Sequence, residues 1–187
     1  VVEVMGRHCG YLAMMSGLAT GAERIYLNEE GITLHDLVND IEWMNDNFEH
    51  GKRVGLIIRS EHANEVYSTA LVSALFEEEG QDLYDVRQSI LGHLQQGGNP
   101  SPFDRIQATR FATRCINYLI EQVEKRSGDS AFIGLQGKEL KFHNLEDFHR
   151  MADLKYQRPK EQWWLSLLPM VKLLSQPEPN ISRRKKN

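Results

Sequence analysis

Residues 1–21, VVEVMGRHCGYLAMMSGLATG, contain the pattern that decides the fold. The apolar run VVEVM predicts a strand over 1–5, and CGYLAMMSGLATG predicts a helix over 9–21 after a short loop. Four small residues allow this helix to pack closely against a neighbour: Gly10, Ala13, Gly17 and Gly21. The segment therefore reads as a βα unit. Because the first residue already lies within the predicted strand, we expect that an amino-terminal part of the protein precedes it.

The same alternation of strand and helix continues along the chain. Further strands are predicted over 24–27, 54–59 and 86–91, and further helices over 33–47, 64–79 and 102–125. Residues 131–135 and 139–142 bracket Gly137 as a hairpin. The order βαβαβαβα predicts an α/β fold with a mostly parallel sheet, flanking helices and right-handed crossovers.

Composition and charge narrow the class of protein. The chain has 187 residues, of which 41% are hydrophobic and 26% charged, so it can bury a sizeable core. A net charge of -4 argues against a nucleic-acid partner, and the basic tail ISRRKKN is too short to reverse that. Cys9 and Cys115 lack the spacing of metal ligands, so we expect reduced thiols and no metal site. The sequence has no membrane-length apolar stretch, which predicts a cytoplasmic protein without a membrane partner.

The stretch LGHLQQGGNPSPFDR, residues 91–105, must turn after the last predicted strand of the sheet. Gly97 and Gly98 permit positive φ, and Pro100 and Pro102 withhold backbone donors. The stretch follows a strand, so its first residues lie at the carboxyl edge of the sheet, where open α/β sheets bind ligands. An ordinary surface turn would have the same local sequence.

Three loops follow predicted strands, at 6–8, 60–62 and 93–96, and we expect them to converge on this edge. Basic and imidazole side chains suited to a phosphate are available at Arg7, His8, Arg87 and His93. Glu61 can accept hydrogen bonds from sugar hydroxyls, and the helix that opens at Gly10 would add free backbone N–H groups. Together these groups predict a site for a phosphorylated sugar. Taken singly, Glu61 could be a helix-entry acid, Arg87 a surface ion pair and His93 a turn residue.

Three of these stretches resemble one protein family. MGRHCGYLA, the Glu61 loop and ILGHLQQGGNPSPFDR are similar to segments of the ATP-dependent 6-phosphofructokinases, and RPKEQWW at 158–164 resembles the end of the long eukaryotic-type enzymes with two homologous halves. The resemblance implies that residues 1–174 are the carboxyl-terminal, sugar-phosphate-binding part of one half. Residues 175–187 are then expected to be a basic flexible tail.

The resemblance also implies a set of site residues. The family's sugar-phosphate contacts fall on Met5, Gly6, Arg7, Glu61, Arg87, His93, Leu94, Gln95 and Gln96, with a further phosphate contact at Arg158. Arg87 and His93 match the arginine and histidine that hold the 6-phosphate, from across a subunit contact or within the pocket. The family's ATP loop and catalytic base have no match here. The resemblance therefore implies that ATP, Mg²⁺ and the catalytic residues belong upstream, and that this chain alone is inactive.

The implied activity is transfer of the γ-phosphoryl group of Mg-ATP to fructose 6-phosphate in glycolysis, by a tetramer of full-length subunits. Catalytic halves of the family have arginine where Gln96 stands, whereas halves that bind a regulatory bisphosphate typically read QQGG. Arg7 instead agrees with the catalytic pattern. Because RPKEQWW follows the carboxyl-terminal half, we favour an allosteric fructose 2,6-bisphosphate site, with a catalytic fructose 6-phosphate site as the alternative.

Two other classes of protein fit the sequence less well. A non-enzymatic α/β interaction domain would explain the fold, but not the gathering of Arg, Glu and His side chains at strand ends. A dinucleotide-binding oxidoreductase would need GxGxxG after a strand, and GRHCG lacks that spacing. Near the end of the chain, Trp163 and Trp164 predict packing of the carboxyl-terminal helix onto the sheet or a neighbouring half, because adjacent indoles are costly to expose.

Overall fold

The computed structural model describes residues 1–174, and the predicted tail over 175–187 lies outside the described residues. The chain divides into two compact units. Among the described residues, the first contains Val1–Gln95 and residues 162–174, and the second contains Gln96–Glu161. The first unit has a parallel sheet, whereas the second has two antiparallel strand pairs.

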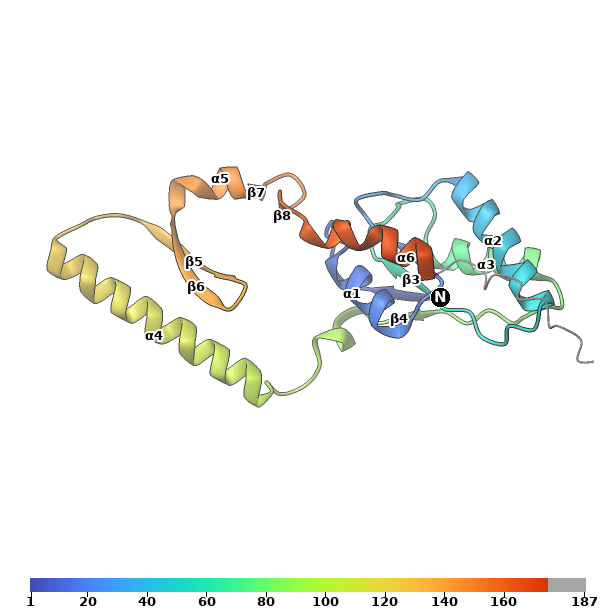
Figure 1. The fold of residues 1–187 in the computed structure, drawn as a ribbon, viewed down its shortest axis with the longest axis horizontal. Coiled ribbons are helices and arrows are strands. Elements are labelled where there is room, and N and C mark those ends of the chain that lie inside the picture. The colour runs from blue at the N-terminus through green and yellow to red at the C-terminus, as the bar shows by residue number, and fades with distance from the viewer. Residues whose placement is uncertain (175–187) are drawn as a thin grey trace, which may run out of the picture. The chain divides into compact units, whose positions relative to one another are not determined.

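A four-stranded parallel sheet forms the centre of the first unit (Figure 1). Its strands are β1 (Val2–Val4), β2 (Arg24–Tyr26), β3 (Ile57–Ser60) and β4 (Ser89–Ile90). They lie in the order β2-β3-β1-β4, and every neighbouring pair is parallel. The register pairs Glu3 with Arg59 and Val2 with Ser89. The predicted α/β fold with a mostly parallel sheet and flanking helices is confirmed.

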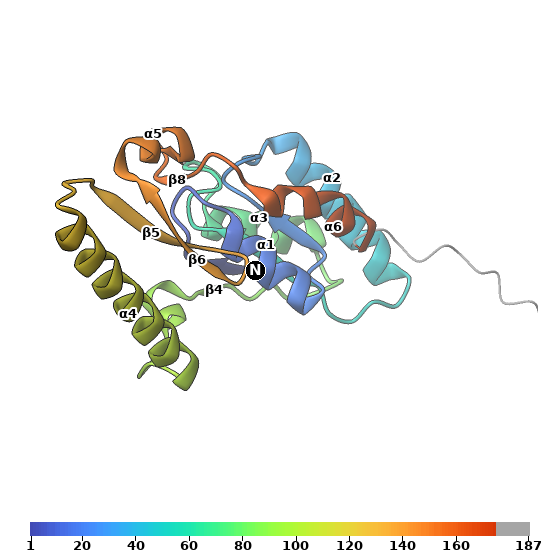
Figure 2. The same cartoon turned by 60° about the vertical axis from the view of Figure 1, so that its left-hand side comes forward.

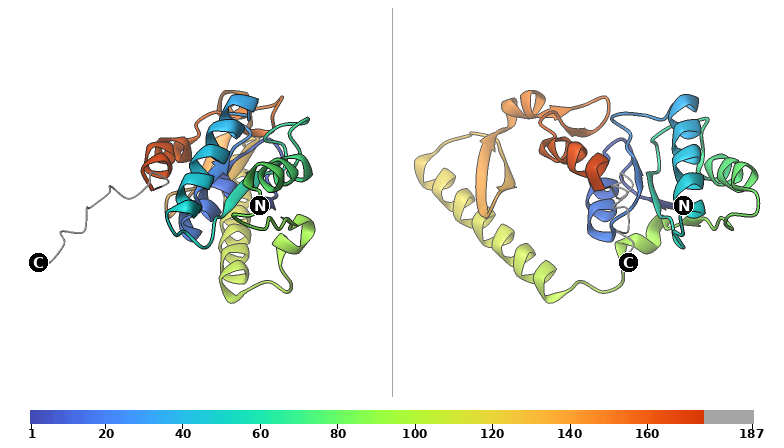
Figure 3. Two further views of the ribbon diagram at one scale, coloured as in Figure 1. Left: turned by 90° about the vertical axis from the view of Figure 1, so that its right-hand side faces the viewer. Right: turned by 45° about the vertical axis from the view of Figure 1, so that its right-hand side comes forward.

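Helices cover both faces of this sheet. They are α1 (Tyr11–Thr20), α2 (Leu34–Glu49), α3 (Thr69–Gly80) and α6 (Leu168–Leu174), with the 3₁₀ helices η1 (Gly92–Gln96) and η3 (Trp163–Leu167). One buried cluster joins α1, η3 and α6 to Ile58, and a second joins α2 and α3 to Ile57. Because successive strand residues point to opposite faces, these clusters lie on opposite sides of the sheet. Figures 2 and 3 show α6 on the same side as α1, and α2 next to α3.

The second unit is built on a long helix and a hairpin. Its elements are α4 (Pro102–Lys125), β5 (Ala131–Gln136), β6 (Glu139–Asn144), η2 (Leu145–Asp147), α5 (Phe148–Met151), β7 (Ala152–Asp153) and β8 (Arg158–Pro159). The predicted hairpin is confirmed, since β5 and β6 pair antiparallel around Gly137. Tyr118 of α4 stacks on Phe142 of β6, with ring centroids 4.2 Å apart. None of the helices within residues 1–174 combines the length and the apolar character needed to cross a membrane.

One helix and two strands are shorter in the structure than the sequence predicts. The helix predicted over 64–79 begins only at Thr69, because the Asn64 side chain accepts from the N–H groups of Val66 and Tyr67 and so closes a turn. Ser68 then caps α3 through a bond from the Leu71 N–H. The strands predicted over 54–59 and 86–91 are shorter, at Ile57–Ser60 and Ser89–Ile90.

The two tryptophans near the carboxyl end behave differently. Trp164 is 4% exposed and belongs to the buried cluster on the α1 side, which confirms its predicted packing onto the sheet. Trp163 is 57% exposed in this chain, so it does not pack onto the sheet as Trp164 does, and its packing against a neighbouring half stays a prediction. Both indole rings contact the Tyr11 ring edge to face, with ring centroids 5.4 Å apart for Trp164 and 6.0 Å apart for Trp163.

Close packing of α1 on the sheet depends on Gly17. A Cβ atom at this position would lie 2.1 Å from Cδ1 of Ile25, a residue that is 9% exposed. Gly10, Ala13 and Gly17 are all buried, as their small size predicted. Gly21 is exposed and instead ends the helix with φ 66°, so its predicted packing role is wrong.

Gly17→Ala is expected to destabilise the protein by about 1–3 kcal/mol, because the new methyl group overlaps Ile25. Helix propensity alone would favour alanine by about 1 kcal/mol. The free energy of unfolding should be measured for Gly17→Ala, Ile25→Ala and the double variant. The double variant should lose less stability than the sum of the single losses, since removing the Ile25 side chain makes room for the methyl group. Additive losses would contradict the close contact.

Candidate functional site

Three loops meet at the carboxyl edge of the sheet, and Glu61 ties two of them together. Oε1 of Glu61, which follows β3, accepts from the N–H of Gly6 at 3.1 Å and from the N–H of Arg7 at 2.5 Å. Gly6 has φ 148°, and a Cβ there would lie 2.4 Å from the Cys9 carbonyl oxygen, so the turn requires glycine. The predicted convergence of the 6–8 and 60–62 loops is confirmed.

The loop after β4 joins the same edge through Gln95. Oε1 of Gln95 accepts from the N–H of Met5 at 2.8 Å, so η1 is fixed against the end of β1. Within η1, the side chains of His93, Leu94 and Gln96 are exposed, and Leu94 is 85% exposed. The structure therefore brings Met5, Gly6, Arg7, Glu61 and residues 92–95 of η1 together, with the His93 imidazole accessible to solvent.

A fourth loop, after β2, reaches this edge and was missed by the sequence analysis. Asn28 donates from Nδ2 to the His62 carbonyl at 2.5 Å, and the rings of His8 and His62 lie 5.1 Å apart. Both carboxylate oxygens of Glu29 accept from the N–H of Gly10, each at 2.9 Å. The expectation of a free N–H at Gly10 is therefore wrong, because a carboxylate from the next loop already caps α1.

A buried arginine, Arg59 of β3, hydrogen-bonds to the backbone of the Glu61 loop. Arg59 is 2% exposed; it pairs with Glu3 at 2.8 Å and donates to the carbonyls of Glu61 at 3.1 Å and Asn64 at 2.7 Å. The Thr69 hydroxyl also donates to Glu3. Burial lowers the pKa of Arg59, while the Glu3 charge acts in the opposite direction. The only signal for this ion pair in the sequence was one charged residue in each of two apolar runs, Glu3 in VEV and Arg59 at the end of IIR.

Arg87 does not join the other predicted site residues. It precedes β4, at the amino edge of the sheet, where its carbonyl accepts from the Val1 amino group at 2.7 Å. Its side chain is 84% exposed and lies 3.9 Å from an Asp85 carboxylate oxygen. The expectation that Arg87 gathers with His93 at the carboxyl edge is wrong within this chain, because the two residues flank β4 on opposite ends.

The last two predicted site residues, Gln96 and Arg158, lie in different elements. Gln96 is the last residue of η1. Arg158 belongs to β8 in the second unit, where its guanidinium carbon lies 4.8 Å from the centre of the Tyr156 ring. Within residues 1–174, no three His, Cys, Asp or Glu side chains are grouped so that they could hold a metal ion.

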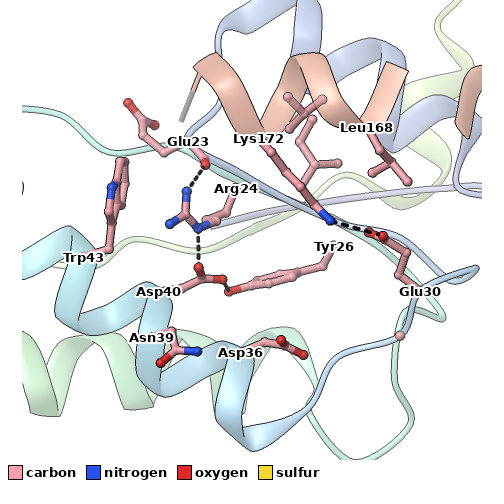
Figure 4. Close-up of a pocket in the computed structure, with 13 residues that line it drawn as sticks. Glu23, Arg24, Tyr26, Glu30, Asp36, Asn39, Asp40, Trp43, Leu168 and Lys172 are labelled. Carbon is pink, nitrogen blue, oxygen red and sulfur yellow. Dashed lines mark hydrogen bonds and ion pairs between the residues drawn. The ribbon is translucent and has the colours of Figure 1, made fainter. Parts of the chain in front are cut away.

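A cavity of about 580 Å³ lies elsewhere in the first unit, between β2, α2 and α6 (Figure 4). Asp40 accepts there from Nε of Arg24 and, at 2.8 Å, from the Tyr26 hydroxyl. Burial, followed by the Asp40 charge, raises the pKa of Tyr26. The Arg24 guanidinium also lies 4.1 Å from the centre of the Trp43 ring. None of the predicted sugar-phosphate residues lines this cavity.

Comparisons with known proteins agree on one family. Residues 1–119 match the protein family described as phosphofructokinase. The chain is 46% identical over 174 residues to an ATP-dependent 6-phosphofructokinase of Dictyostelium discoideum, covering 90% of this chain and 20% of that protein. It is 36% identical over 188 residues to the muscle-type enzyme of Oryctolagus cuniculus, covering 95% of this chain and 24% of that protein.

Solved structures give the same result. The phosphofructokinase of Saccharomyces cerevisiae matches with a TM-score of 0.84 and 36% identity, over 93% of this chain and 24% of that chain. The Pichia pastoris phosphofructokinase in the T-state matches with a TM-score of 0.81 and 31% identity, over 93% of this chain and 22% of that chain. The chain thus spans between a fifth and a quarter of the length of these relatives.

Glu29→Ala is expected to lower the free energy of unfolding by about 1–2 kcal/mol, because α1 loses the carboxylate that caps its first N–H. The matched control is Glu30→Ala, which removes an exposed carboxylate 3.8 Å from Lys172 and should cost no more than about 1 kcal/mol. Chemical denaturation of both variants measures the difference. Equal losses in the two variants would show that Glu29 does not cap α1.

Proposed function

The chain belongs to the phosphofructokinase family, and from this premise we propose that the protein carrying it is an ATP-dependent 6-phosphofructokinase. Such an enzyme transfers the γ-phosphoryl group of ATP to the 1-hydroxyl of fructose 6-phosphate, with catalysis mainly by positioning and charge stabilisation. The part played by this chain is to bind a sugar phosphate at the carboxyl edge of the sheet. The observation that carries the proposal is the meeting of the Gly6–Arg7 turn, Glu61 and η1 at that edge.

Each group at this edge has a distinct role in the proposed site. The cationic side chain of Arg7 and the exposed imidazole of His93 suit the phosphate. A carboxylate accepts about four hydrogen bonds, so Glu61 can accept from a sugar hydroxyl in addition to the two backbone N–H groups it already holds. Met5, Gly6, Leu94 and Gln95 shape the backbone around the sugar. Arg158, which belongs to the second unit, is proposed as a further phosphate contact on the strength of the family resemblance alone.

We propose that the ligand is the regulatory fructose 2,6-bisphosphate. Gln96 offers a neutral amide where catalytic halves of the family carry arginine, and RPKEQWW resembles the end of the carboxyl-terminal half. Arg7 is the observation that favours the second candidate, a catalytic fructose 6-phosphate site, since regulatory halves usually have glycine there. The two candidates differ in whether loss of the site reduces regulation or turnover.

The remaining parts of the enzyme are proposed to lie in the rest of the protein. No ATP loop or catalytic base was identified in this chain, so ATP and Mg²⁺ are proposed to bind upstream and the chain by itself to have no activity. We also propose a cytoplasmic tetramer of full-length subunits. The exposed position of Arg87 at the amino edge supports a role for its guanidinium in the site of a neighbouring subunit.

His93→Ala in the full-length protein is expected to weaken fructose 2,6-bisphosphate about 10- to 100-fold. A hydrogen bond to a charged group contributes about 1.5–3 kcal/mol, which corresponds to that range. Isothermal titration calorimetry measures the Kd, and the effector concentration for half-maximal activation should rise by the same factor. The control His50→Ala removes an exposed histidine of the α2 C-cap and should leave the Kd unchanged.

Two results would contradict this reading. If His93→Ala lowers saturated turnover by orders of magnitude while activation by fructose 2,6-bisphosphate survives, the site is catalytic. If the full-length protein binds neither fructose 6-phosphate nor fructose 2,6-bisphosphate, the proposed function is wrong.

Arg87→Ala is expected to weaken the same ligand by a similar factor, but through a neighbouring subunit. Co-expression of Arg87→Ala with His93→Ala subunits tests this arrangement. In a mixed oligomer, an Arg87→Ala subunit keeps His93 and can receive Arg87 from a neighbouring His93→Ala subunit. Such sites should regain the wild-type Kd, which neither variant has alone. If the mixed oligomers contain no such sites, Arg87 acts within its own subunit or not at all.

A further inference from the structure

Arg59 joins the interior of the sheet to the loop that carries Glu61. On the side of the sheet, its Nη1 donates to Glu3 at 2.8 Å and lies 3.4 Å from the Thr69 hydroxyl. On the side of the loop, Nη1 donates to the Glu61 carbonyl at 3.1 Å and Nη2 to the Asn64 carbonyl at 2.7 Å. One buried guanidinium therefore holds the two carbonyls at the start and end of a four-residue segment.

This segment is fixed at the same two points by other bonds. The N–H of Glu61 donates to the Val4 carbonyl at 3.0 Å, which extends the pairing of β3 with β1. Asn64 donates from Nδ2 to the Ile32 carbonyl at 3.0 Å and accepts from two N–H groups of the following turn. From the first of these points, Glu61 extends its carboxylate to the N–H groups of Gly6 and Arg7. The direction of the Glu61 side chain thus depends on a backbone held by Arg59.

Stability alone does not explain an ion pair at this position. Burying two charges costs several kcal/mol, and well-packed apolar residues of similar volume are often as stable or more stable. A planar guanidinium, however, can donate to separate acceptors in fixed directions, which a lysine ammonium or an apolar side chain cannot do. What the arginine adds at this place is the geometry of the loop.

We propose that Arg59 is a positioning residue for the sugar-phosphate site: it orders the Glu61–Asn64 segment so that the Glu61 carboxylate meets both the Gly6–Arg7 turn and the ligand. The inference rests on the proposed function for the identity of the ligand. Arg59 itself is 2% exposed and does not contact the sugar; it acts through Glu61.

The test compares Arg59→Lys with Arg24→Lys in the full-length protein. Arg59→Lys keeps the positive charge beside Glu3 but removes the fork that holds the two carbonyls. Arg24→Lys is the matched control. Arg24 lies on the neighbouring strand β2, is partly buried and pairs with Asp40 of α2, and it is remote from the Glu61 loop. Both variants are expected to lower the Tm.

Only Arg59→Lys should change the site. Its Kd for fructose 2,6-bisphosphate and for fructose 6-phosphate, whichever ligand the wild type binds, should rise at least tenfold. Amide hydrogen exchange over residues 61–64 should become at least tenfold faster, with exchange in α2 unchanged. If Arg59→Lys lowers the Tm but leaves either the Kd or the exchange of residues 61–64 at the wild-type value, the positioning role is wrong.

A second variant decides the question if Arg59→Lys does not fold. The nearly isosteric Thr69→Val removes the hydroxyl that holds Glu3 against Arg59. In this variant, amide exchange over residues 61–64 should become at least threefold faster, and an unchanged exchange rate would overturn the proposal. If the wild type binds no phosphosugar, the proposed function fails. The exchange comparison still decides whether Arg59 orders the segment.

Discussion

The ion pair between Glu3 and Arg59 is the interaction on which the sheet and its carboxyl edge both depend. The two residues are register partners on β1 and β3, the two inner strands of the order β2-β3-β1-β4. A charge buried in this position must be paired and hydrogen-bonded, since the desolvation cost is otherwise prohibitive. The protein meets that requirement partly with the carbonyls of the following loop. The same bonds that make the buried charge tolerable therefore also hold the backbone of the Glu61 loop.

Protein side chains satisfy several backbone donors at this edge. Glu61 accepts from the N–H groups of Gly6 and Arg7, and Gln95 accepts from that of Met5. Glu29 accepts from the N–H of Gly10 in the same way. Such bonds organise the loops before any ligand arrives, which reduces the ordering cost of binding. They also mean that these N–H groups are not open to a phosphate in this arrangement. Under the proposed function, phosphate recognition therefore depends on side chains such as Arg7 and His93.

Much of this architecture could be predicted because its causes are local. Alternating apolar runs led to the parallel sheet, and Thr33, where the helix predicted over 33–47 begins, caps α2 as part of a capping box with Asp36. The meeting of the loops after β1, β3 and β4 follows from a general property of parallel strands, that their carboxyl ends share one edge. The residues that carry the family resemblance at Met5–Arg7, Glu61 and Gln95 are the ones that these loops bring together.

The sequence by itself determined the α/β class, the parallel sheet and the edge at which the loops meet, because periodicity, capping and strand direction are properties of short segments. Only the tertiary structure decided which groups are used at that edge. Arg87 falls at the other end of β4, Glu29 occupies the N–H expected to be free at Gly10, and Arg59 pairs with Glu3 while it donates to the Glu61 carbonyl. The last two arrangements depend on partners 19 and 56 positions apart in the chain, Gly10 with Glu29 and Glu3 with Arg59. Their register and burial arise only when the strands pair, so no local pattern of residues encodes them.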